Sequence, residues 1–302
     1  MKVLRITVQS FTLLIFLVLL LMGSVWGATT PVVTFGADLS GEQRDAMLRI
    51  FGLTGTAASG VTELEVTNAE EKKYLKNLVP ENVIGIRSIS SAFVELLPAG
   101  RGVNAETYNI TWVTGAMYSN ALITAGVKDA RVIAASPFPV SGTAALTGVL
   151  KAFETATGIK LSEERKQAAN EELVRTGELG QQIQDKDKAT KLIMLVKDQV
   201  LQKKLTDPVE IRNIVVNIAA QLNINLTPEQ LNQIVDLMAR ISKTPISLAE
   251  FRGQLAGVQE KINLVLEKQQ QARSILDQIW SVILNLVNQI KALLQLGSSG
   301  SK

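Results

Sequence analysis

Cysteine and histidine are both absent from the 302-residue sequence. Without cysteine the chain forms no disulfide, presents no thiolate nucleophile and has no residue for a lipid anchor after a leader. Without histidine it lacks Ser-His-Asp and Cys-His catalysis, the common zinc sites, and the side chain best suited to proton transfer near neutral pH. Carboxylate-pair chemistry, a Ser-Lys dyad, a metal site with oxygen ligands or no catalysis remain, and no cofactor is predicted.

Excess charge is also scarce. The formal net charge of +3 includes Lys2 and Arg5 at the N-terminus; without them 29 basic side chains oppose 28 acidic ones, a net of +1. This balance does not indicate the clustered positive surface that nucleic acids need. With 46% hydrophobic residues the chain can bury a core, and its length indicates about two domains.

A leader is indicated at the N-terminus. An apolar run, Phe11–Met22, follows the basic residues, and Val25-Trp26-Gly27 offers a cleavage site before Ala28. This layout is typical of a secretory signal peptide covering residues 1–27. The alternative is a retained anchor helix, because Ile6–Met22 approaches the roughly 17 residues that span a bilayer. We therefore expect a secreted, extracellular protein that can stay associated with the cell envelope.

The region 28–158 alternates short apolar strands with helices, which predicts an α/β domain. The order strand, helix, strand, helix occurs in Val32–Leu78 and again in Ile110–Phe153, and we interpret this as a duplicated βαβα unit. Between the copies, Ile84–Leu97 and Tyr108–Val113 flank a glycine-containing turn and are expected to pair as a central β-hairpin. The alternative is the alternation that any α/β domain shows.

Two helix starts in this domain have the spacing of capping boxes. Ser40 is followed three residues later by Gln43, and Asn68 by Glu71. In both pairs the first side chain can accept from the backbone of the second, and the second can reach back. We expect helices to begin at these positions.

Five short segments of the same region are distinctive in combination: Val33–Leu39, Val66–Glu71, Ile89–Ser91, Asn109–Val113 and Ser136–Ala145. Together they resemble the DUF1002 family, the YpuA-like secreted proteins of Firmicutes. The resemblance runs from about Val32 to the helices beyond Thr227. It implies an exported Gram-positive protein without an established activity, and it leaves the function open.

A candidate ligand site lies between a strand and a helix. Pro137 and Pro139 are expected to stiffen this loop, and Ser141 to cap a helix over Gly142–Ala156. The free N–H groups and dipole of a helix start can hold an anion, such as a phosphate or carboxylate of a wall polymer. The alternative is a well-capped helix after a rigid turn, and the segment lacks the spacing of a P-loop. The candidate binding residues are Ser136, Ser141, Gly142 and Thr143.

A second candidate site is acidic. Glu63 and Glu65 share one face of a predicted strand, and Glu95 lies on another. Cleavage of a glycoside needs two carboxylates about 5–10 Å apart across the bond. These side chains are therefore alternative catalytic residues, although the same face can simply be the solvated one.

The region 159–296 has fewer glycines and regular capping signals, which predicts a helical bundle domain. Asp207-Pro208 and Thr227-Pro228 each place a cap before a proline at the first helical position. A flexible tail, residues 297–302, is expected to follow. The predicted helices lie near 163–182, 187–204, 208–222, 228–242 and 248–296.

The last predicted helix carries an apolar seam over residues 258–293 with alternating spacings of four and three. Gln269 alone interrupts the seam, and from Ile275 a second apolar stripe runs beside it. A sustained heptad seam predicts a helix that packs in the bundle or against another chain, as in a homo-oligomer. Attachment to a membrane surface is the less favoured alternative, because the polar face carries little basic charge.

These observations favour a secreted, non-catalytic protein that binds a partner in the cell envelope or serves as a scaffold. One alternative is a carboxylate-dependent hydrolase of a wall glycan. Another is a membrane-surface protein that uses the last helix. The ligand, the oligomeric state and the physiological role are not indicated by the sequence.

Overall fold

The computed structural model describes residues 30–55, 60–76, 78–79, 84–142 and 145–298. The predicted signal peptide and its cleavage site lie outside this part of the chain and stay predictions.

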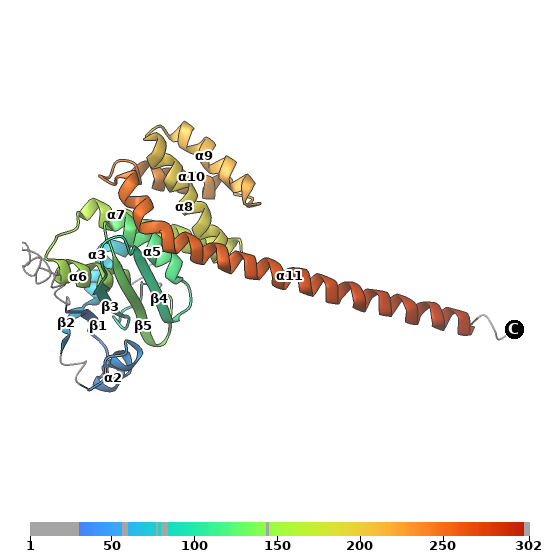
Figure 1. Cartoon of the computed structure of the whole chain (residues 1–302), viewed down its shortest axis with the longest axis horizontal. Helices are drawn as coiled ribbons and strands as arrows, with labels where there is room; N and C mark the ends of the chain where they lie inside the picture. The colour runs from blue at the N-terminus through green and yellow to red at the C-terminus, as the bar shows by residue number, and fades with distance from the viewer. Residues whose placement is uncertain (1–29, 56–59, 77, 80–83, 143–144, 299–302) are drawn as a thin grey trace, which may run out of the picture. The chain divides into compact units, whose positions relative to one another are not determined.

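A mixed five-stranded sheet forms the N-terminal half (Figure 1). Its order is β2-β1-β3-β5-β4. β1 and β2 run parallel, as do β4 and β5, whereas β3 is antiparallel to both of its neighbours. The strands are β1 (Val32–Gly36), β2 (Thr62–Val66), β3 (Ser91–Leu96), β4 (Val103–Ile110) and β5 (Ala130–Val140).

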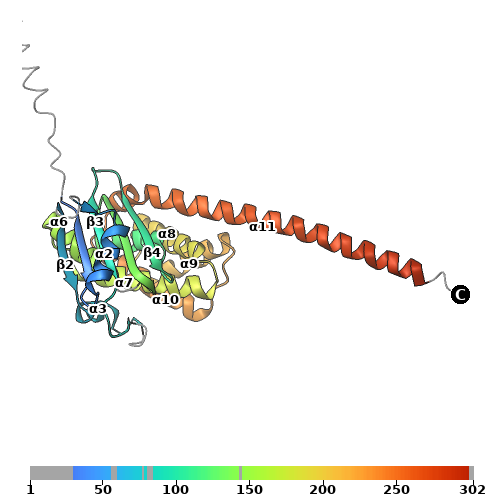
Figure 2. The same cartoon turned by 90° about the horizontal axis from the view of Figure 1, so that it is seen from below.

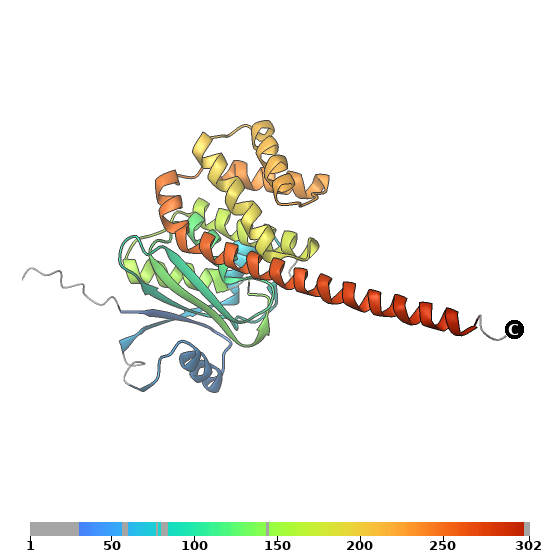
Figure 3. The same ribbon diagram turned by 45° about the vertical axis from the view of Figure 1, so that its right-hand side comes forward.

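Helices cover both faces of the sheet: α2 (Gly41–Ile50), α3 (Asn68–Leu75), α5 (Gly115–Ala125) and α6 (Ala145–Thr157). α2 starts at the predicted capping box of Ser40 and Gln43 and packs Met47 against Phe35 and Phe93 on one face. α5 and α6 pack on the opposite face, in the larger hydrophobic cluster. Figure 3 shows α2, in dark blue, on one side of the sheet and the green and yellow helices on the other.

α3 begins one residue earlier than predicted. Thr67, not Asn68, is its N-cap: Thr67 Oγ1 accepts from the backbone N–H of Glu70, and the Glu70 carboxylate accepts from the N–H of Thr67 at 2.8 Å. The predicted capping partner, Glu71, is 1% exposed. The capping box is therefore present, but one residue earlier than predicted. Glu70 fills the capping position, and the next side chain along the helix, Glu71, points into the interior.

The predicted β-hairpin between Ile84–Leu97 and Tyr108–Val113 is wrong. β3 and β4 both form, but β5 lies between them and pairs with each. β4 also starts earlier than predicted, at Val103. The turn after β3 marks a reversal of the chain, but a turn alone does not fix the neighbour of a strand. β5 takes the inner position because its apolar residues bury both of its faces.

The strand–helix–strand–helix order does occur twice, as β1-α2-β2-α3 and as β4-α5-β5-α6. The two halves are nevertheless packed differently. β3 is flanked by the first strand of one half, β1, and by the second strand of the other, β5. α2 and α5 also cover opposite faces of the sheet. The repeated order is therefore not a repeated arrangement in space.

The C-terminal region is mostly helical, and its helices begin and end within two residues of the predicted positions. Asp207 and Thr227 cap helix starts as predicted, and Ser162 caps the helix that starts at Glu163. The helices are α7 (Glu163–Gln182), α8 (Lys186–Lys203), α9 (Pro208–Gln221), α10 (Pro228–Ile241) and α11 (Leu248–Ser298). Figure 2 shows α11 as one continuous helix.

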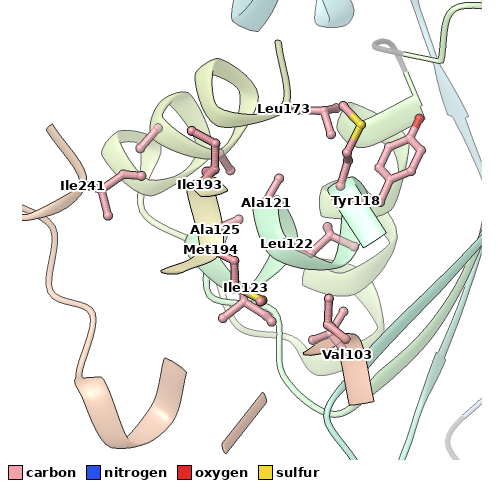
Figure 4. Close-up of a cluster of buried hydrophobic side chains, with 14 of the residues drawn as sticks. Val103, Tyr118, Ala121, Leu122, Ile123, Ala125, Leu173, Ile193, Met194 and Ile241 are labelled. Atoms are coloured by element: carbon pink, nitrogen blue, oxygen red, sulfur yellow. The ribbon is translucent and has the colours of Figure 1, made fainter. Parts of the chain in front are cut away.

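The sheet region and the helical region share one hydrophobic core. Leu122 of α5 lies in the same cluster as Leu173 of α7, Ile193 of α8 and Ile241 of α10 (Figure 4). The chain from Pro31 onward forms one compact unit by its internal contacts. The division into domains 28–158 and 159–296 stays a prediction, and no gap in the packing marks it.

Candidate functional site

The predicted anion-binding loop is partly strand. β5 continues to Val140, so Pro137 and Pro139 belong to the strand and not to a loop as predicted. Beyond Ala135, β5 no longer pairs with β3. The two prolines therefore remove no backbone hydrogen bond between these strands. Ser136 is fully buried, and its hydroxyl has no partner among the described residues.

Gly142 follows the strand with a positive φ of 95°. A Cβ here would lie 2.3 Å from the side chain of Ile110, and the buried Tyr118 hydroxyl donates to the Gly142 carbonyl. The glycine is therefore required by the packing of its own backbone. α6 begins at Ala145 rather than at Gly142, Ser141 is partly exposed, and Thr143 lies outside the described residues. Anion binding by these residues stays a prediction.

The three candidate carboxylates lie on two strands that are not neighbours. β1 separates β2, with Glu63 and Glu65, from β3, with Glu95, which places the two backbones about 10 Å apart. Arg44 forms an ion pair with Glu65, and Arg131 one with Glu95 at 3.5 Å. The arrangement gives two separate surface ion pairs, and a catalytic role for the three residues stays a prediction.

The predicted seam of α11 divides into a buried and an exposed part. Val258 and Ile262 of the predicted seam are buried, as is Phe251 before it, in the part of α11 that packs on α5, α8 and β4. Beyond them a run of large apolar side chains is 37–62% exposed. We call this run the α11 seam; it comprises Leu264, Val265, Ile275, Leu276, Ile279, Trp280, Ile283 and Leu284.

A charged cavity lies between α3, α6 and the start of α7. It has a volume of about 240 Å³, and four lysines are among the residues that line it: Lys73, Lys151, Lys160 and Lys166. Lys166 pairs with Glu154 at 2.8 Å. This cavity could not be predicted, because its lysines are spread over 93 positions of the chain and no local pattern joins them.

α3 also carries a buried carboxyl, that of Glu71. The Ser88 hydroxyl donates to Glu71, the Asp38 carboxylate accepts from the Ser88 N–H at 2.7 Å, and Glu71 Oε2 has no partner among the described residues. Burial raises the pKa of the Glu71 carboxyl to about 7; hydrogen bonds from Ser88 and Asn68 oppose this, and the charges of Asp38 and Glu70 add to it.

A second buried charge pair joins the helices. Lys197 Nζ of α8 lies 2.6 Å from Glu172 of α7 and 2.7 Å from the Thr124 hydroxyl of α5, and 4.9 Å from the ring centre of Phe251 in α11. Burial lowers the pKa of Lys197 and raises that of Glu172, while their attraction opposes both changes. With all partners buried, this network fixes how the helices meet.

Within the part of the chain that the structure describes, none of the helices combines the length and the apolar character needed to span a bilayer. No group of three or more acidic side chains there is placed to hold a metal ion.

Comparison with known proteins bears on the family. A family model described as "Protein of unknown function (DUF1002)" matches residues 35–258. The chain is 38% identical over 262 residues to the uncharacterized protein YpuA of Bacillus subtilis (strain 168), covering 84% of this chain and 89% of that protein. No solved structure matches the chain. The resemblance seen in the five short segments is confirmed, and the chain belongs to the DUF1002 family.

Proposed function

We propose that this protein is a non-catalytic scaffold of the cell envelope that assembles with further copies of itself through the α11 seam. The observation that carries this proposal is the run of large apolar side chains left exposed along one long helix. The envelope location rests on the predicted signal peptide. Glu65 and Glu95 are each paired with an arginine, which does not favour the hydrolase alternative.

An apolar surface of this kind favours a partner. Leu276 and Trp280 are 62% and 61% exposed, and exposed apolar area is unfavourable in water. Contiguous patches of this kind usually mark a contact surface. A helix in water also gains most of its stability from packing an amphipathic face. A partner on the α11 seam would therefore stabilise the helix as well as cover it.

The shape and charge of the seam favour a second copy as that partner. Ile275 and Trp280 widen the seam beyond its two core positions, which is typical of a helix in a multi-helix bundle. The segment 264–284 carries two acidic and two basic residues. Copies of this segment would not repel one another, and an anionic membrane would find little positive charge on it.

Sedimentation analysis of the chain from Ala28 tests the proposal. We expect the wild type to form oligomers and Leu276→Asp with Ile279→Asp to be monomeric, because a charge in the seam opposes burial. The matched control is Gln271→Asp with Gln278→Asp, which adds the same charges at exposed polar positions of α11 and should leave assembly unchanged. A monomeric wild type at its highest soluble concentration would overturn self-assembly.

The same variants separate the membrane alternative. If the wild type is monomeric and sediments with anionic vesicles, and the seam variant does not, α11 docks on lipid and the self-assembly proposal is wrong. Fractionation of a Gram-positive host that expresses the full chain tests the location. Recovery in the wall or medium supports the envelope proposal, and recovery only in the cytoplasm contradicts it.

A further inference from the structure

We propose that the cavity between α3, α6 and the start of α7 is a binding site for a small phosphate-bearing ligand, a phosphate monoester or diester. The inference is independent of the α11 seam and of assembly. It rests on the charge of the cavity, on the hydrogen-bond donors that its lysines retain, and on its size.

The walls of the cavity carry more positive than negative charge. Four lysines line it, against the carboxylates of Glu70 and Glu154. A third carboxylate, that of Glu163, is not among the lining residues but accepts hydrogen bonds from Lys73 and Lys166. A partly enclosed space with excess positive charge attracts an anion more strongly than an open surface does.

Lys166 is the most rigidly placed of these lysines. Its ammonium bonds to Glu154 at 2.8 Å and to Glu163 at 3.0 Å, and its side chain is 9% exposed. An ammonium group has three N–H donors, so one remains for a ligand. The two carboxylates hold the group in place before a ligand arrives, which lowers the ordering cost of binding.

Lys151 and Lys73 retain donors in the same way. Lys151 Nζ bonds to Glu70 at 2.6 Å and to the Glu65 carbonyl at 2.7 Å. Lys73 Nζ bonds to Glu163 at 2.8 Å. Each bond uses one donor, so both lysines keep at least one for a ligand.

Lys160 differs because it is free to turn. Its side chain is 88% exposed, and among the described residues it makes only a 3.7 Å ion pair with Glu154. It lies in the short connection between α6 and α7, just after Gly158 with its φ of 69°. This lysine can therefore turn over a ligand that the other three already hold.

Size and donor type together indicate phosphate. The cavity, at about 240 Å³, is smaller than the roughly 300–1,000 Å³ of pockets that hold drug-sized ligands. Lysine acts as a compact point charge with rotatable donors and binds phosphate well. A single phosphate group with a small substituent fits these conditions better than a nucleotide does.

The test is a titration of the chain from Ala28, followed by calorimetry, with sn-glycero-3-phosphate and with bis(glycero)phosphate. Lys160→Gln and Lys151→Gln should each weaken binding by about tenfold, the effect of one lost charge-assisted contact. The matched control is Lys128→Gln, which removes a lysine from an ion pair with Glu250 (3.2 Å) outside the cavity. Thermal unfolding curves of all variants check that each remains folded.

Several results would overturn the proposal. They are no heat of binding with either phosphate probe, an equal loss in the Lys128→Gln control, and binding of acetate as tight as that of the phosphates. Vesicles of phosphatidylglycerol distinguish the two sources of such a group. Competition by vesicles for the soluble probe supports a lipid headgroup, and its absence, with soluble binding intact, supports a free or polymer-borne phosphate.

Discussion

Replacing Glu71 by glutamine should stabilise the protein at pH 8 and leave its stability nearly unchanged at pH 4.5. Burial raises the pKa of this carboxyl from its ordinary 4.5 to about 7. The folded state therefore holds the proton more tightly than the unfolded state does. Between these two values the free energy of unfolding falls as the pH rises, and above pH 7 the whole loss is present.

The size of this effect follows from the two pKa values. Their difference of about 2.5 corresponds to roughly 3 kcal/mol, which is an upper bound if the site relaxes on ionisation. Glutamine keeps the shape of the side chain and can still accept from Ser88, but it carries no charge to bury. The variant should therefore avoid most of the loss above pH 7.

Urea unfolding of both proteins at pH 4.5, 6 and 8, followed by circular dichroism, measures this difference. Glu70→Gln is the matched control one residue away. Burial raises the pKa of Glu70, but the ion pair with Lys151 and the bonds from Thr67 outweigh this and hold it below its ordinary value. Glu70→Gln should thus destabilise at pH 8 and at pH 6, and its effect should fade only as the pH falls below 4.5, through the lowered pKa of the folded state. Equal stability of wild type and Glu71→Gln at pH 8 would refute the reasoning.

Two further substitutions test the interior. Lys197→Met should lower the free energy of unfolding by about 3–5 kcal/mol, because it leaves Glu172 charged and buried. Adding Glu172→Met should restore most of this loss. Urea unfolding of both variants measures the difference, and a double variant as unstable as the single one would contradict the prediction. Gly142→Ala should lower the free energy of unfolding by more than about 1 kcal/mol, because the φ of Gly142 is positive and the new methyl group would clash with Ile110. An unchanged melting temperature would contradict this prediction.

The helices could be located from the sequence because their signals are local. A cap such as Thr227 and the proline after it lie within a few residues of the backbone groups that they satisfy. The strand pairing could not be located in this way. β3 and β4 lie on either side of a turn in the sequence, yet β5, which begins some 20 residues after the end of β4, lies between them in the sheet. The choice of neighbour depends on which strand can be buried on both faces, and this is a property of the whole sheet.

The candidate sites show the same division. The heptad spacing of residues 258–293 indicated a contact surface, but only the packing of α11 showed that Val258 and Ile262 are used inside the protein. The capping pattern near Glu71 was displaced by a single residue. Because consecutive side chains of a helix point about 100° apart, the one-residue error assigned Glu71 to the capping position when it is in fact buried. The lysine cavity had no local signal, since it is built from α3, α6 and α7.

The measurement that tests self-assembly most directly uses Trp280, which is 61% exposed in the α11 seam. Within the chain from Ala28, Trp112→Phe leaves Trp280 as the single tryptophan. Acrylamide quenching of its fluorescence is then followed as the protein is diluted without lipid. If copies assemble through the seam, Trp280 is shielded at high concentration and becomes accessible on dilution. Full accessibility at every concentration would contradict assembly through α11.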